Sequence, residues 1–112
     1  MTGRRLDGDD LLRLLAALSN PHRLRILARL TEKRSYVSQL ARDVGISRPL
    51  LIMHLKRLEE VGLVSSTLEL SPDGKAVRYY TVEPFEVRLN PGVIAAAAGT
   101  LTGDTGSDPD PG

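Results

Sequence analysis

The 112-residue sequence contains no cysteine, and this absence excludes several kinds of chemistry. Disulfides, thiolate metal sites, thiol redox sensing and cysteine nucleophiles all require a sulfur atom that the chain lacks. Only two histidines are present, so a zinc site would need oxygen ligands gathered from scattered loops. We therefore expect no metal and no other cofactor.

Aromatic residues and long apolar runs are also scarce. Four aromatic residues in the whole chain leave a core built from leucine, isoleucine, valine and alanine. No run approaches the roughly 20 apolar residues that a membrane-spanning helix needs. The first residues combine two arginines with three aspartates and no apolar stretch, which is unlike a secretory signal peptide. We expect a single-domain cytoplasmic protein with no membrane partner.

Motifs of catalysis are absent as well. The sequence has no glycine-rich phosphate loop after a strand, no HExxH and no GxSxG. The serine and histidine residues fall on helices that are predicted to be packed, without an orienting acid. An enzyme is therefore not expected.

The chain does contain a series of amphipathic segments with helical spacing. Residues 9–19 begin with aspartates, which suit the positive end of a helix, and carry a stripe of leucines. Leu12 adds more apolar surface than one buried face requires, which indicates either deep burial or a dimer contact. A second helix starts at Asn20 and Pro21 and runs to about residue 33, and a third covers residues 37–44.

The segment from Ser47 to Val64 is the centre of the pattern. Ser47 is suited to cap a helix, Pro49 falls in its first turn and Gly62 ends it. One face repeats leucine at helical spacing and is predicted to be buried. The opposite face carries Arg48, Ile52, Met53, Lys56 and Arg57.

Gly45 links this helix tightly to the preceding one, as in a helix-turn-helix. After Gly62 the spacing changes to alternation, so that residues 63–70 and 76–82 are predicted strands around a Pro-Asp-Gly turn. This hairpin would form a wing. Residues 85–89 alternate like another short strand, and Asn90 with Pro91 predicts a last helix.

The remaining segments complete a domain plan. Residues 1–8 are predicted to be a flexible arm, residues 9–102 the folded domain, and residues 103–112 a disordered acidic tail. Net charge is +1, but residues 20–62 carry nine Lys or Arg against four Asp or Glu. This local +5 suits a nucleic-acid partner, although a solvated surface would also explain it.

Several motifs in this order resemble the ArsR-type family of winged helix-turn-helix transcriptional regulators. They are Ser19–Leu27, Gln39–Ala41 and His54–Val64, followed by the hairpin. The resemblance implies a mostly helical α+β fold, a winged helix-turn-helix with a β-hairpin wing. It also implies a homodimer that binds a palindromic double-stranded DNA operator, usually as a repressor released by an effector.

Members of that family dimerise through their first and last helices, which here correspond to residues 9–19 and 90–101. The resemblance thus implies a dimer interface made by Leu11, Leu14, Leu15, Leu18, Val93 and Ile94. Metal sensors of the family carry cysteines at the start of the third helix or histidine and acidic ligands on the last helix. This chain has Val37–Leu40 and an alanine-rich segment there, which argues against a metal sensor.

In such a fold the second helix of the helix-turn-helix, here within Ser47–Val64, is the recognition helix. Its N-terminal half enters the major groove. We predict that Arg48 forms a bidentate contact to guanine and that Ile52 and Met53 make apolar contacts to bases. The predicted phosphate contacts are Arg42, Ser47, His54, Lys56, Arg57, Lys75 and Arg78.

Two alternatives remain open at this point. Ile52 and Met53 are equally compatible with packing in a core or interface, and His54 with a packed or capping role. The same fold could also act as a protein-interaction module that docks a partner on Leu50, Ile52 and Met53. An unidentified small-molecule or protein effector is compatible with either function.

Overall fold

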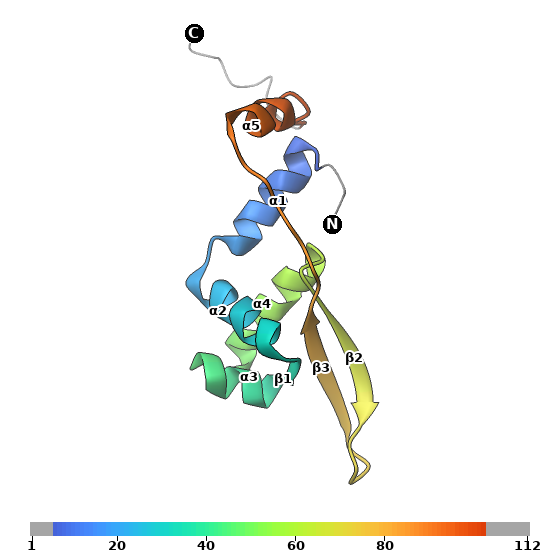
Figure 1. Cartoon of the computed structure of the whole chain (residues 1–112). Helices are drawn as coiled ribbons and strands as arrows, with labels where there is room; N and C mark the ends of the chain where they lie inside the picture. Colours follow the sequence, from blue (N-terminus) through green and yellow to red (C-terminus); the bar gives the residue numbers. More distant parts are fainter. Residues whose placement is uncertain (1–5, 103–112) are drawn as a thin grey trace.

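The computed structural model describes residues 6–102, and within them the chain forms five helices and three strands (Figure 1). In order along the chain these are α1 (Gly8–Leu18), α2 (Pro21–Glu32), β1 (Ser35–Tyr36), α3 (Val37–Val44), α4 (Arg48–Glu60), β2 (Val64–Leu70), β3 (Ala76–Val82) and α5 (Pro91–Ala98). The predicted winged helix-turn-helix fold class is confirmed. None of the helices in this range is long and apolar enough to cross a membrane.

Side-chain caps begin three of the helices where the sequence places them. The Asn20 side-chain oxygen accepts from the backbone N–H of His22 at 2.8 Å, and the Ser47 hydroxyl accepts from that of Leu50 at 3.3 Å. Asn90 caps α5 in the same way, accepting from the N–H of Val93 at 2.8 Å. Each cap satisfies an N–H that the first turn of a helix leaves without a partner.

The turn between α3 and α4 depends on Gly45, whose φ is +80°. A side chain is strained in this left-handed region, whereas glycine adopts it readily. The N–H groups of Gly45 and Ile46 both donate to the carbonyl of Ala41, at 2.8 and 3.1 Å. This ends α3 and allows α4 to start three residues later, which makes α3 and α4 a helix-turn-helix.

The core lies where α2, α3 and α4 pack together, beneath α1 (Figure 1). Its fully buried side chains are Leu14, Ile26, Leu40, Leu51, Leu55, Leu58 and Leu63. Tyr80 of β3 joins the same cluster. The hairpin is thereby anchored at its base, and its tip projects beyond the helices.

The sheet is antiparallel, with β3 between β1 and β2. Residues Ser35 and Tyr36 of β1 pair with Tyr80 and Tyr79 of β3. The hairpin register sets Val64 opposite Val82 and Leu70 opposite Ala76. The two predicted hairpin strands are therefore confirmed to within one residue, whereas β1 was not predicted.

The strand predicted at residues 85–89 is wrong, because the segment pairs with no other strand among the described residues. Its alternation has another cause. Phe85 and Val87 pack against the core, while Glu86 and Arg88 are exposed. An extended connection that crosses the body thus produces the same pattern as a strand.

The predicted flexible arm is also wrong at its inner end. Leu6 packs against the core, the Asp7 carboxylate caps α1 by accepting from the N–H of Asp10 at 2.8 Å, and Gly8 is buried. The N–H of Gly8 donates to the hydroxyl of Thr100 at 2.6 Å. Residues 1–5 of the predicted arm and the predicted tail, residues 103–112, lie outside the described residues.

Candidate nucleic-acid interface

The outer face of α4 carries three exposed cations. Arg48, Lys56 and Arg57 are exposed, and their side chains have no hydrogen-bond or ion-pair partner within residues 6–102. Between them Ile52 and Met53 are 50% and 51% exposed. The structure therefore brings together, on one exposed face, five of the residues predicted to contact DNA.

Two more of the predicted contacts flank the start of α4. Arg42 on α3 is exposed and donates to the side-chain oxygen of Gln39 at 2.8 Å. The Ser47 hydroxyl accepts the N–H of Leu50 and so caps the helix, which leaves its O–H group free to donate. Ser47 therefore lies at the end of α4 that carries Arg48.

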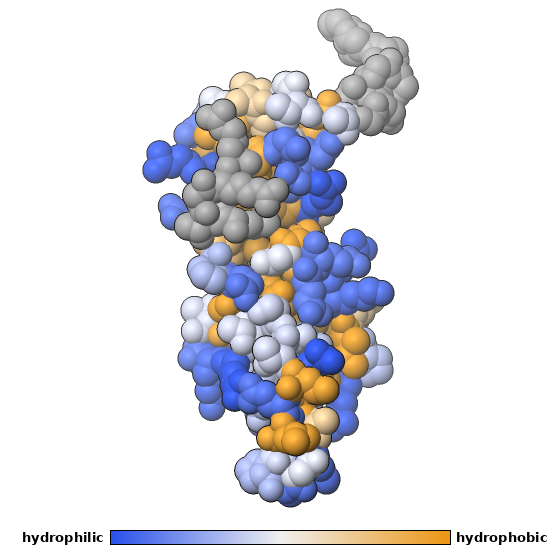
Figure 2. All heavy atoms as spheres, turned by 90° about the vertical axis from the view of Figure 1, so that its right-hand side faces the viewer, coloured by the Kyte–Doolittle hydropathy of each residue, from blue (hydrophilic) through white to orange (hydrophobic). Residues whose placement is uncertain are grey.

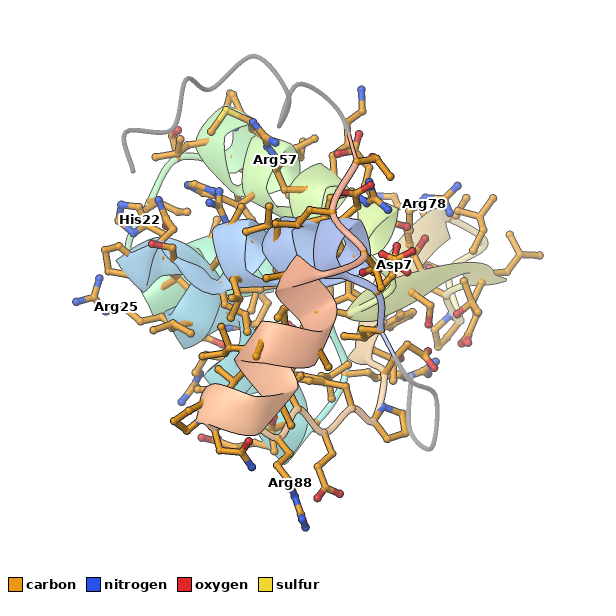
Figure 3. All side chains as sticks on the ribbon, turned by 90° about the horizontal axis from the view of Figure 1, so that it is seen from above. Asp7, His22, Arg25, Arg57, Arg78 and Arg88 are labelled. Carbon is orange, nitrogen blue, oxygen red and sulfur yellow. The ribbon has the colours of Figure 1, made fainter. Side chains whose placement is uncertain are left out.

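The wing supplies the last two predicted cations. Lys75 lies in the exposed turn and Arg78 on β3, where its guanidinium donates to the hydroxyl of Ser66 at 3.2 Å. The Ser66 hydroxyl in turn donates to the carboxylate of Glu59 on α4 at 3.3 Å. The hairpin face that bears Arg78 is thus the face joined to α4, and Figure 3 labels Arg78 on the wing and Arg57 on α4.

This face of the wing also carries two exposed leucines that are not among the predicted contacts. Leu68 and Leu70 are 60% and 76% exposed, and the register sets them opposite Arg78 and Ala76. Figure 2 shows apolar side chains at the surface of the hairpin next to its tip. The alternation of residues 66, 68 and 70 on one side of a strand could have revealed them.

His54 is not at the interface, so its predicted phosphate contact is wrong. The side chain is 3% exposed and packs inside the molecule. Residues 51, 54, 55 and 58 share one face of a helix, and that face is turned to the core. The guanidinium of Arg23 lies 3.0 Å from His54 Nδ1. Burial lowers the pKa of His54, and the charges of Arg23 and His22 lower it further.

A second candidate surface is formed by α1 and α5, which pack against each other at the top of Figure 1. The backbone N–H and the hydroxyl of Thr102 both donate to the carboxylate of Asp9, linking the two ends of the domain. Beside α5 runs a groove of about 940 Å³, lined in part by Leu11, Val87 and Val93.

Two of the predicted dimer contacts are wrong, because Leu11 and Leu14 are buried within the protomer. Leu14 belongs to the central core cluster and cannot reach another chain. Leu15, Leu18 and Val93 are half-buried, and Ile94 is exposed. Leu12 is also exposed. Since α5 is almost wholly apolar yet mostly exposed, it has the composition of a helix that is covered in the assembled protein.

Metal-binding side chains do not gather in the described part of the chain. Within residues 6–102 there is no group of three or more histidine, cysteine, aspartate or glutamate side chains placed to hold a metal ion. The two histidine rings are neighbours, with centroids 5.5 Å apart, but no carboxylate accompanies them.

The chain is similar in sequence to known regulatory proteins. The family model described as "Bacterial regulatory protein, arsR family" matches residues 20–66, the segment from the cap of α2 to the start of the wing. An uncharacterized HTH-type transcriptional regulator of Methanocaldococcus jannaschii is 34% identical over 85 residues, which cover 76% of this chain and 88% of the relative.

Two further proteins are similar to this chain in sequence or in structure. The HTH-type transcriptional regulator CmtR of Mycobacterium tuberculosis is 42% identical over 69 residues, which cover 62% of this chain and 55% of CmtR. A solution structure of a homodimeric winged helix-turn-helix DNA-binding domain from Mycobacterium bovis superposes with a TM-score of 0.60 at 28% identity. That superposition covers 73% of this chain and 75% of the domain.

Proposed function

The chain belongs to the ArsR family of bacterial regulatory proteins, and we propose that it is a homodimeric repressor that binds a specific double-stranded DNA operator. The observation that carries the proposal is the exposed face of α4, where Arg48, Lys56 and Arg57 have no partner within the described residues. Arginine and lysine side chains without protein partners next to a wing are what a DNA backbone and major groove require.

Side-chain chemistry indicates which residues contact bases and which contact phosphates. Arg48, near the N-terminal end of α4, reads guanine through two parallel hydrogen bonds, while Ile52 and Met53 contact the methyl groups of thymine. The other exposed cations, Arg42, Lys56, Arg57, Lys75 and Arg78, bind phosphates and set the position of the protein without reading sequence. Ser47 contributes a neutral phosphate contact. Because the partner is DNA, the proposed location is the cytoplasm.

The dimer in this proposal is formed by α1 and α5. Its support is the apolar surface of α5 and α1, where Ile94 and Leu12 are exposed and Val93 and Leu15 are half-buried. A dimer places two copies of α4 side by side, which suits an operator with two-fold symmetry. We propose that no metal cofactor takes part, since the chain has no cysteine, and that any effector is a small molecule or a protein.

An anisotropy titration with duplex DNA tests the proposal. Specific binding should weaken steeply as salt is raised, and Arg48→Ala should reduce discrimination between specific and scrambled duplexes by about 1–3 kcal/mol. Lys56→Ala should instead weaken binding to both duplexes and lower the salt slope by about one. The absence of any salt-dependent binding to duplex DNA would rule out the proposed DNA partner.

The exposed Ile52 and Met53 also support a second candidate, a protein-docking face on α4. Met53→Arg separates the two. A basic side chain at this position should maintain or raise DNA affinity if the face binds DNA, whereas it should abolish the docking of an apolar partner.

A further inference from the structure

The guanidinium of Arg23 joins three helices. It extends from the first turn of α2, and its Nε donates to the carbonyl of Ala17 at 2.6 Å and its Nη2 to that of Ala16 at 3.3 Å. Its Nη1 lies 3.0 Å from Nδ1 of His54 on α4. One side chain thus connects the C-terminal end of α1 to the interior of the recognition helix.

At the α1 end, Arg23 provides what the helix itself lacks. The last carbonyls of a helix have no N–H one turn further on, and they form the negative end of its dipole. α1 has no basic residue in its last turn. The carbonyl of Ala16 also accepts from the N–H of Ser19 at 3.3 Å, and Arg23 adds further donors and the positive charge from the next helix.

At the α4 end, the contact fixes the state of a buried imidazole. A guanidinium can only donate, so Nδ1 of His54 accepts the hydrogen bond and the ring proton resides on Nε2. The charged or titratable groups facing this ring are Arg23 and His22, both from α2. The ring centroids of His22 and His54 are 5.5 Å apart. The groups of α1 that accept hydrogen bonds from the guanidinium are the backbone carbonyls of Ala16 and Ala17. A neutral His54 is therefore the state that completes the bridge.

We propose that Arg23 is a positioning residue for DNA binding, which sets the orientation of α4 relative to α1 through His54. This inference rests on the proposed function, in which α1 contributes to the dimer interface and α4 reads DNA. In that arrangement the Arg23 bridge transmits the geometry of the dimer to the two recognition helices. The spacing of the half-sites that the dimer prefers then depends on Arg23.

Arg25 provides a matched control. It lies two residues further along α2, has the same charge and projects away from the protein in Figure 3. It has no hydrogen-bond or ion-pair partner in the part of the chain that the structure describes. Replacing either arginine by alanine removes the same net charge, so only the loss of the bridge distinguishes the two variants.

The experiment uses the full chain and three duplexes of about 30 base pairs, long enough for two half-sites one helical turn apart. The first is selected by the wild-type protein from a random pool, the second has one base pair inserted between the half-sites, and the third is scrambled. We expect Arg23→Ala to weaken binding to the selected duplex by about tenfold, as the loss of a charged hydrogen bond would. The penalty for the inserted base pair should also shrink, whereas Arg25→Ala should keep the wild-type penalty.

A purely structural role for Arg23 would lower stability without changing the preferred spacing. The ratio of the affinities for the selected and inserted duplexes is therefore the decisive readout.

An NMR titration of the His54 ring adds a second readout. Its pKa should rise in Arg23→Ala, because the nearby cation is gone, and stay unchanged in Arg25→Ala. Arg23→Lys retains the charge but places its donors on a single nitrogen, which cannot reproduce the three separate contacts of the guanidinium. It should restore the pKa of His54 and only part of the spacing preference, and it also serves if Arg23→Ala does not fold.

Two outcomes would overturn the inference in distinguishable ways. If the Arg23 and Arg25 variants show the same ratio of affinities for the selected and inserted duplexes, Arg23 does not position α4, and DNA binding as such is unaffected. If the wild-type protein itself does not prefer a selected duplex over the scrambled one, both the inference and the proposed function are wrong.

Discussion

The guanidinium of Arg34 and the carboxylate of Glu69 form a two-point ion pair, with N···O distances of 2.5 and 3.1 Å. Arg34 follows α2, and Glu69 lies on β2 of the wing. The same guanidinium stacks on the ring of Tyr79, 4.1 Å from its centroid. Since Tyr79 belongs to β3, Arg34 links both strands of the hairpin to the end of α2.

Glu69→Gln should therefore loosen the wing without unfolding the domain. The neutral amide keeps the shape of the side chain but removes the charge that pairs with Arg34. We expect faster hydrogen exchange at the amides of residues 70–76 and a modest loss of DNA affinity. Glu86→Gln, in the exposed connection before α5, removes a carboxylate far from the wing and should change neither. Equal exchange rates in the two variants would contradict the role of the ion pair.

Gly8→Ala should separate α1 from α5. A Cβ atom at residue 8 would overlap the carbonyl oxygen of Ala97 and lie 2.7 Å from a methyl group of Leu101. Overpacking of this kind costs about 1–3 kcal/mol, and we expect that loss in the free energy of unfolding. Gly92→Ala is the control, because its nearest neighbour would be 3.5 Å away. A thermal melt in which both variants resemble the wild type would show that this contact is not tight.

Ile94→Glu should abolish dimerisation while the protomer stays folded. Ile94 is exposed on α5, so that a carboxylate there is solvated in the monomer but buried without a partner in the proposed interface. Sedimentation measures the change in mass. Leu14→Ala serves as the contrast, since it empties a core site and should lower stability by about 2–5 kcal/mol. A dimeric Ile94→Glu variant would place the interface elsewhere.

Stability should fall as the solution is acidified below the ordinary pKa of histidine. Burial lowers the pKa of His54 in the folded protein, so the unfolded chain takes up a proton at this residue before the folded one does. The contribution of His54 is complete above the unfolded value of 6.5 and is lost as pH falls from there toward the lowered value. His54→Gln should remove this part of the pH dependence of the melting temperature. A wild-type profile that stays flat from pH 7 to pH 5 would contradict it.

The fold was predictable where the signals are local. Helix ends depend on residues close in sequence, as at the caps Asn20, Ser47 and Asn90 and at the glycine after α3. The alternating strands likewise flank a Pro-Asp-Gly turn. β1 was not predictable in this way. It has two residues and exists only because Ser35 and Tyr36 pair with a strand more than forty positions away.

The candidate site was predictable in part, for a related reason. Helical spacing identifies the face of α4 that carries Arg48 and Lys56, and it also places position 54 among the buried leucines. The contact of His54 with Arg23 required the packing of α2 against α4 to be known. Leu14 shows the same limit of sequence-based prediction. The spacing of a leucine stripe is the same whether the stripe faces the protomer core or a second copy of the chain. Arg23 gave no signal, since its partners lie on two other helices.

Selection of bound sequences from a random pool of duplexes, followed by anisotropy titration of the enriched sequence, tests the central proposal most directly. The account predicts an enriched pair of inverted half-sites about 10 base pairs apart, bound with an affinity that falls steeply with salt. Failure to enrich any sequence, or enrichment of a single half-site bound by a monomer, would contradict a homodimeric, sequence-specific DNA-binding regulator.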